Sequence, residues 1–286
     1  MLFIDLLVQG FLQGGIYALI AIGLTLVYGL LRILHVAHAG LYTLGGYIAV
    51  LVTNATGSFT LGIIVSMISV GLMGMMIYRL LYQPILEKPP FVALIASIGL
   101  FIAMEEIYRI IFGPYGITFV AAPLQGTLNI FGIYLRHCEI GTIILATVLI
   151  AALSLFTKYT RIGIAWRATV TDPGMAQSFG VDVTKVRYLN FFIGSAMAAG
   201  AGSMVALLNN LVEPTMGSVP SYKALAIIVL GGLGNVRGTV IAALIIGISE
   251  AFGTIYLGNI LDRDSIAFAL LILVLMVKPT GLFAKR

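Results

Sequence analysis

Charged residues are scarce in this sequence of 286 residues. Only 9% of the chain is Asp, Glu, Lys or Arg, against about 25% in an ordinary soluble domain. Hydrophobic residues make up 60% of the chain, and the mean hydropathy is +1.09. Too few charges are left to cover a water-soluble surface, so the composition predicts an all-α polytopic membrane protein embedded in a lipid bilayer.

Cysteine and the common catalytic motifs are also lacking. The single Cys138 excludes a disulfide within the chain and any CxxC metal or redox site. The sequence contains no Walker A, HExxH or GxSxG motif and no second, polar domain. We therefore expect no catalytic residues, no metal and no cofactor, and ATP hydrolysis would need a separate chain. The net charge of +5 needs no nucleic acid to explain it, because membrane proteins keep basic residues in cytoplasmic loops.

Nine apolar runs are long enough to cross or enter a bilayer, and a full span needs roughly 20 residues. They cover residues 6–31, 36–53, 59–81, 91–112, 140–157, 189–210, 222–235, 239–257 and 265–278. The start of the chain lacks the features of a signal peptide, so we expect it to begin the first membrane helix. The prediction is one transmembrane domain, 1–286, with about nine segments. Whether the short segments 222–235 and 265–278 cross fully stays open.

The longest polar stretch, about 158–188, contains the densest group of basic residues, five of the sixteen in the chain. Placing this stretch and the C-terminus in the cytoplasm leaves four of the sixteen Lys and Arg at or near the outer face, which agrees with the positive-inside rule. The N-terminus is then external. Within the stretch, Asp172 and Pro173 form a helix start signal, and Gly180 is suited to end that helix.

Several segments interrupt the apolar pattern. His35, His38 and three glycines between 32 and 46 indicate either a broken, re-entrant helix or a cytoplasmic turn. Residues 113–139 indicate an external loop with a small hairpin, which could meet a substrate-delivering partner or only cap the bundle. Four glycines between 231 and 238 indicate a sharp break between two membrane segments. Small residues four apart, at Gly194, Ala198, Gly202 and Ala206, favour close helix packing inside the chain over a dimer interface.

Acidic residues inside membrane segments are candidates for functional sites. Glu105 and Glu106 precede Arg109 by four and three residues, so they either form a structural ion pair near the outer face or contact substrate. Glu250 has no partner in its own segment; we expect a hydrogen bond to another helix, with lining of the path as the alternative. His38 and Tyr42 are further candidates for polar groups in a translocation path.

A series of motifs, in their order along the chain, resembles the LivH-type permeases of branched-chain amino-acid ABC importers. The resemblance covers nearly the whole length. The resemblance rests on IYALIAIGLTLVYGLLRILHVAHAG, IASIGL with IFGP, RATVTDPGMAQSFGVDVTKVR, EPTMG, KALAIIVLGGLGNVRG, ISEAFG and IAFALLILVLMVKPTGLF. It implies a permease subunit of the bacterial inner membrane, usually in a heterodimer with a related permease. Two cytoplasmic ATPase chains and a periplasmic substrate-binding protein would complete the importer. It also implies that a coupling helix containing Asp172, Met175, Ala176, Gly180 and Val181 docks in a groove of the ATPase.

One departure from the family pattern bears on the substrate. Where the family commonly has an Asn-Phe-Ala-His-Gly-Glu-like run, this chain has His35-Val36-Ala37-His38-Ala39-Gly40, without the acid. Branched-chain amino acids, amides, urea and related small solutes therefore all stay open. A stand-alone secondary carrier or channel is the alternative function, because broken helices and the acids Glu105, Glu106 and Glu250 would suit it.

Overall fold

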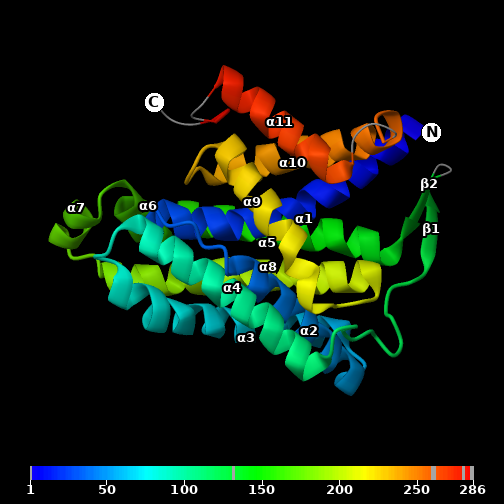
Figure 1. Ribbon diagram of the computed structural model, residues 1–286, viewed down its shortest axis with the longest axis horizontal. Helices are drawn as coiled ribbons and strands as arrows, with labels where there is room; N and C mark the ends of the chain where they lie inside the picture. Colours follow the sequence, from blue (N-terminus) through cyan, green and yellow to red (C-terminus); the bar gives the residue numbers. More distant parts are fainter. Residues whose placement is uncertain (1, 131–132, 259–261, 279–280, 284–286) are drawn as a thin grey trace.

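The computed structural model describes residues 2–130, 133–258, 262–278 and 281–283, and these form a bundle of roughly aligned helices (Figure 1). The bundle contains α1 (Leu2–Leu31), α2 (His38–Thr56), α3 (Phe59–Ile77), α4 (Pro90–Phe112), α5 (His137–Tyr159), α6 (Arg161–Thr171), α7 (Pro173–Ser178), α8 (Val183–Asn209), α9 (Ser218–Gly231), α10 (Val236–Tyr256) and α11 (Arg263–Val277). A π-helical turn, Tyr78–Tyr82, and a 3₁₀ turn, Gln83–Ile85, extend α3, and another 3₁₀ turn, Pro214–Gly217, precedes α9.

Each of the nine predicted apolar segments falls on one of these helices, but the count of nine membrane spans is not confirmed. Within the described residues, six helices are long and apolar enough to cross a membrane: α1, α3 with its extension, α4, α5, α8 and α10. Of the other three, α2 has 19 residues but is not apolar enough, whereas α9, with 14 residues, and α11, with 15, are too short. A helix of 14 residues reaches only about 21 Å, less than the roughly 30 Å of a hydrocarbon core.

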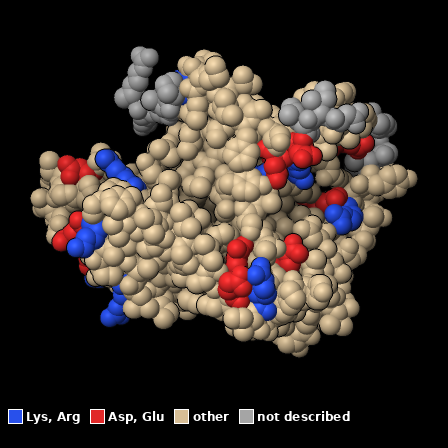
Figure 2. All heavy atoms as spheres, in the orientation of Figure 1, with Lys and Arg blue, Asp and Glu red and all other residues tan. Residues whose placement is uncertain are grey.

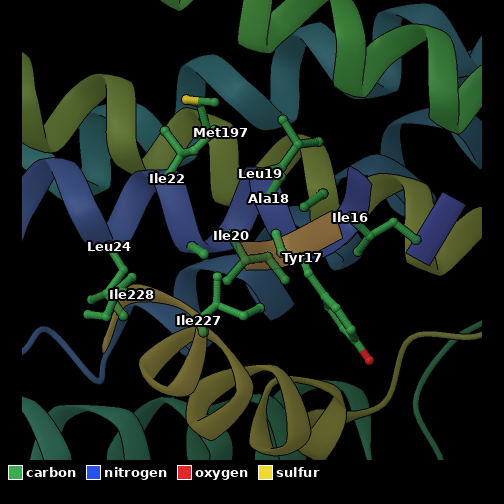
Figure 3. Packing of buried hydrophobic residues seen from close by; sticks show 14 of the residues in the cluster. Ile16, Tyr17, Ala18, Leu19, Ile20, Ile22, Leu24, Met197, Ile227 and Ile228 are labelled. Carbon is green, nitrogen blue, oxygen red and sulfur yellow. The ribbon is translucent and has the colours of Figure 1, made fainter. Parts of the chain in front are cut away.

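The core lies around α1 and α8. Both helices are 78% buried over their most apolar stretch, whereas α5 is only 17% buried. Figure 3 shows Ile20, Ile22 and Leu24 of α1 packed against Met197 of α8 and Ile227 of α9. A Cβ on Gly194 of α8 would contact the Gly23 carbonyl of α1 at 3.0 Å, so small residues let these two backbones meet. Close internal packing was the favoured interpretation of this small-residue pattern, and the structure confirms it.

The two ends of the bundle differ in character. One end carries a hairpin of β1 (Thr127–Ile130) and β2 (Ile133–Arg136), paired antiparallel from Thr127↔Arg136 to Ile130↔Ile133. The opposite end carries α6 and α7 (Figure 1). The predicted hairpin in the 113–139 loop is thus confirmed, although α5 already begins at His137. The polar stretch 158–188 is mostly helical rather than a loop, because α5 continues to Tyr159 and α8 begins at Val183.

Candidate functional site

The short helix α7 lies at the polar end of the bundle, and its ends follow the sequence signals. Asp172 caps it, because its carboxylate accepts a hydrogen bond from the backbone N–H of Met175 at 2.9 Å. Gly180 adopts φ +82° after the helix. The N–H of Val181 then donates to the carbonyl of Ala176 at 3.0 Å, which completes a Schellman-type end.

The surface of α7 is unusually apolar for a polar end of the molecule. Met175 is 58% exposed and Phe179 is 82% exposed, whereas Ala176 points inward with 4% exposure. Capping at one end and a glycine turn at the other fix this exposed pair on a rigid support. Phe179 was not among the predicted contact residues, although a large aromatic residue in a polar stretch is a signal that could have indicated it.

A second feature is the non-helical stretch between α1 and α2, which re-enters the bundle. His35 and His38 are 0% and 2% exposed, and a Cβ on Gly23 would meet Nε2 of His38 at 2.5 Å. Gly23 precedes the end of α1 by eight residues, or about 12 Å along the helix. The stretch between α1 and α2 therefore folds back into the bundle, which favours the broken, re-entrant alternative.

The break before α9 reaches a similar depth from the other side. α8 ends at Asn209, and the chain then turns back so that Gly217 packs against the carbonyl of Ala39 in the first turn of α2. α9 starts there, at Ser218, and runs to the glycine break at 232–235 near Gly29 of α1. Two helices thus begin near the middle of the bundle, where non-helical backbone is tolerated only if protein or a wet cavity surrounds it.

A narrow crevice lies where these two helix starts meet α1. Its lining residues come from α1, the segment before α2, and α9: Ile20, Leu24, His35, Val36, His38, Ala39, Ser221 and Ala224. The crevice is too tight to hold a water molecule, so the role of His38 in a path stays a prediction. Tyr42, one turn further along α2, lies instead in the core cluster with Tyr17 and Ala198.

Glu105 and Glu106 have different partners. Glu106 pairs with Arg109 at 2.5 Å on the exposed surface of α4. Glu105 pairs with no Lys or Arg among the described residues; its Oε1 accepts a hydrogen bond of 2.6 Å from Ser218, the first residue of α9. The predicted structural ion pair with Arg109 is thus confirmed for Glu106 and wrong for Glu105.

Glu250 of α10 is the centre of a buried network of charged residues. Its carboxylate, 0% exposed, accepts hydrogen bonds from Tyr17 at 2.8 Å, from Lys223 at 2.8 Å and from Arg263 at 2.9 Å. Lys223 also donates to Tyr17 at 2.8 Å and pairs with Asp264 at 2.8 Å. The expected hydrogen bond to another helix is confirmed, and it ties α10 to α1, α9 and α11.

Comparison with known proteins identifies the family. A profile described as the permease component of the branched-chain amino acid transport system matches residues 6–277. The chain belongs to this family of transport permeases. The high-affinity branched-chain amino acid transport system permease protein LivH of Salmonella typhimurium is 32% identical to it, over 99% of this chain and 96% of the relative. The carrier or channel alternative is therefore not supported, and the permease is a non-catalytic transport subunit.

A second relative is LivM of the same organism, also named a high-affinity branched-chain amino acid transport system permease protein. It is 28% identical, over 82% of the permease and 60% of LivM. Among solved structures, PsaBC from Streptococcus pneumoniae in complex with Fab matches with a TM-score of 0.50 and 15% identity, over 95% of the permease and 92% of that chain. This likeness concerns the fold alone; the apolar helices and the permease relatives support a multi-pass membrane protein.

Sequence reasoning missed the partners of Glu250 and Glu105. Lys223 and Arg263 were expected at or near the outer face, yet Lys223 is 2% exposed inside the bundle. Lys223 and Arg263 lie 27 and 13 residues from Glu250 along the sequence. At such separations the sequence gives only a weak indication that two charged residues pair. Within the parts of the chain that the structure describes, no group of three or more His, Cys, Asp or Glu could hold a metal ion.

Proposed function

We propose that the permease is the membrane subunit of an ATP-driven importer for branched-chain amino acids or related small solutes. It would form the translocation path as one transmembrane domain, 1–286, and act with a second related permease in a heterodimer. Two cytoplasmic ATPases would drive it, and a periplasmic binding protein would deliver the solute. The family match over residues 6–277 and the similarity to the transport permeases LivH and LivM support this proposal.

The observation that carries the coupling to ATPases is α7. A rigid helix of six residues that exposes Met175 and Phe179 at the polar end is suited to fill an apolar groove in a partner protein. With α7 in the cytoplasm, the basic residues of 158–188 lie inside, the β hairpin and the N-terminus lie outside, and α11 runs toward the cytoplasmic end (Figure 1). Asp172, Gly180 and Val181 would shape the helix, and Ala176 would pack it against the permease.

The path is proposed to run along the face formed by α4, α9 and α11. Figure 2 shows that this face is mostly uncharged, with a few compact groups of acidic and basic side chains. Charged side chains at membrane depth face protein or water rather than lipid. Glu105 would line the path, together with His38 at the crevice, whereas Glu106 is held by Arg109 on the exposed surface of α4. Tyr42 and Glu250 are buried, so they would hold its wall in place from behind.

The test of the coupling is co-purification of the ATPase with variants of α7. Phe179→Ala with Met175→Ala should reduce the ATPase recovered per permease strongly, because both exposed apolar side chains are removed while the caps stay. Gln177→Ala, which changes an exposed polar residue on the same helix, should leave recovery unchanged. Deletion of residues 172–180 should abolish ATPase binding but not membrane insertion. Normal recovery with the deletion would refute the role of α7.

A further inference from the structure

Glu105 is an acid inside the second half of α4, and among the described residues it has no basic partner. It lies 15 residues, or about 22 Å, from the start of α4 at Pro90, and seven residues, or about 10 Å, from the end of α4 at Phe112. Its contact with Ser218 places it at the start of α9, beside the first turns of α2. Both measures put the carboxylate within the membrane-spanning helix α4 rather than at one of its ends, and an unpaired charge inside a membrane helix is costly.

Only one oxygen of the Glu105 carboxylate makes a hydrogen bond among the described residues. Oε1 accepts the hydrogen bond from Ser218, whereas Oε2 makes no hydrogen bond within the described residues. Glu105 is partly exposed, and one turn before it Ile102 is 53% exposed on the same outward part of α4. The free oxygen is therefore open to whatever occupies the α4–α9 face.

A merely structural role would not require a charge here. Glutamine could accept the Ser218 hydrogen bond equally well and would avoid the cost of an ion at this depth. A charged side chain in this position indicates a positively charged ligand. A metal ion is a poor candidate, because a hard cation takes six or more oxygen ligands and the described residues gather no such set.

We propose that Oε2 of Glu105 binds the protonated amino group of the solute as it passes α4 and the start of α9. This inference rests on the proposed importer function and narrows its substrate class. The permease itself then favours solutes that carry an ammonium group, and uncharged amides and urea-like solutes lack the group that Glu105 binds. A charge-assisted hydrogen bond at low dielectric replaces part of the hydration that the ammonium loses.

The experiment uses the complete importer in liposomes, with ATP and a saturating amount of amino-acid-loaded binding protein. Glu105→Gln removes the charge and keeps the acceptor for Ser218, whereas Ser218→Ala removes the hydrogen bond and keeps the charge. Glu106→Gln is the matched control on the next residue of α4. We expect Glu105→Gln to lower the maximal uptake rate by about tenfold or more, because a charge-assisted hydrogen bond is lost in the transition state of solute passage. Ser218→Ala and Glu106→Gln should each stay within about twofold of the parent, since neither removes that charge.

Three outcomes decide between the explanations. Parent-like uptake by Glu105→Gln overturns the proposal, and so does an equal loss with Ser218→Ala, because that would make the contact structural. If the parent permease, without any substitution, purifies without bound ATPases, the importer function itself is refuted.

A second readout tests access without relying on transport. Glu105→Cys should react with a membrane-impermeant thiol reagent and be protected by loaded binding protein, whereas native Cys138 is 0% exposed and should not react. Absence of any labelling would contradict a path at Glu105.

Discussion

Replacing Lys223 with Met should destabilise the folded permease more than any exposed ion-pair variant. Lys223 is 2% exposed, and its ammonium bonds Tyr17, Glu250 and Asp264, each at 2.8 Å. Methionine fills similar space but leaves Glu250, which is 0% exposed, with a cationic partner only at Arg263. Removal of one partner from a buried ion pair costs about 3–5 kcal/mol. Because Arg263 stays in place, we expect about 3 kcal/mol, the lower end of this range.

The control is Lys185→Met in the first turn of α8. Lys185 pairs with Asp182 at 3.2 Å, but the two side chains are 85% and 49% exposed. Such a pair contributes about 0–1 kcal/mol. The free energies of unfolding are to be measured by SDS titration in mixed micelles, followed by circular dichroism.

The double variant Lys223→Met with Glu250→Gln separates the effect of charge from that of packing. It removes both buried charges and leaves Arg263, whose side chain is 48% exposed and can reach water. We therefore expect the double variant to regain part of the stability that Lys223→Met loses. If Lys223→Met costs no more than Lys185→Met, the network does not hold α9 to its neighbours and the reasoning fails.

Two further predictions concern packing and the loop before the β hairpin. Gly23→Ala should lower the free energy of unfolding by about 1–3 kcal/mol, because a Cβ there meets His38 at 2.5 Å and the Gly194 carbonyl at 2.6 Å. The control is Gly99→Ala in α4, where an added Cβ meets nothing within 4 Å and should not destabilise the fold. Equal unfolding midpoints for the two variants would contradict this prediction. Asn54→Ala removes the amide that donates to the Thr118 carbonyl at 3.0 Å and accepts from the Val120 N–H at 2.9 Å. Hydrogen exchange around 116–122 should then accelerate, and unchanged exchange there would show that Asn54 does not hold the loop.

The features that the sequence predicts well are those determined by neighbouring residues. Asp172 before Pro173 and Gly180 after the helix define α7 through contacts within a few residues, and the structure has both caps. The glycine break near 232–235 follows from local conformation in the same way, with Gly232 and Gly234 at positive φ.

The features that the sequence predicts poorly depend on contacts between distant segments. Glu250 meets Tyr17 across 233 residues, and Glu105 meets Ser218 across 113. Nothing in the local pattern of α4 distinguishes Glu105 from Glu106, since both are at pairing distance from Arg109 along a helix. Only the position of α9 decides which acid remains without a basic partner. The pattern likewise could not decide between re-entry and a turn for His35, because burial of that stretch depends on α1 and α8.

The loop between α4 and the β hairpin is bound to the segment before α9 in a way that limits changes to its length. Ile117 and Val212 form a β-bridge with both hydrogen bonds at 2.9 Å, and Val212 precedes the start of α9 by six residues. Surface loops usually accept insertions and vary in length. Here an added residue near Ile117 would shift the backbone that leads directly to Ser218 and Glu105. Length in this loop should therefore be as constrained as in a membrane helix, and affinity tags belong elsewhere on the molecule.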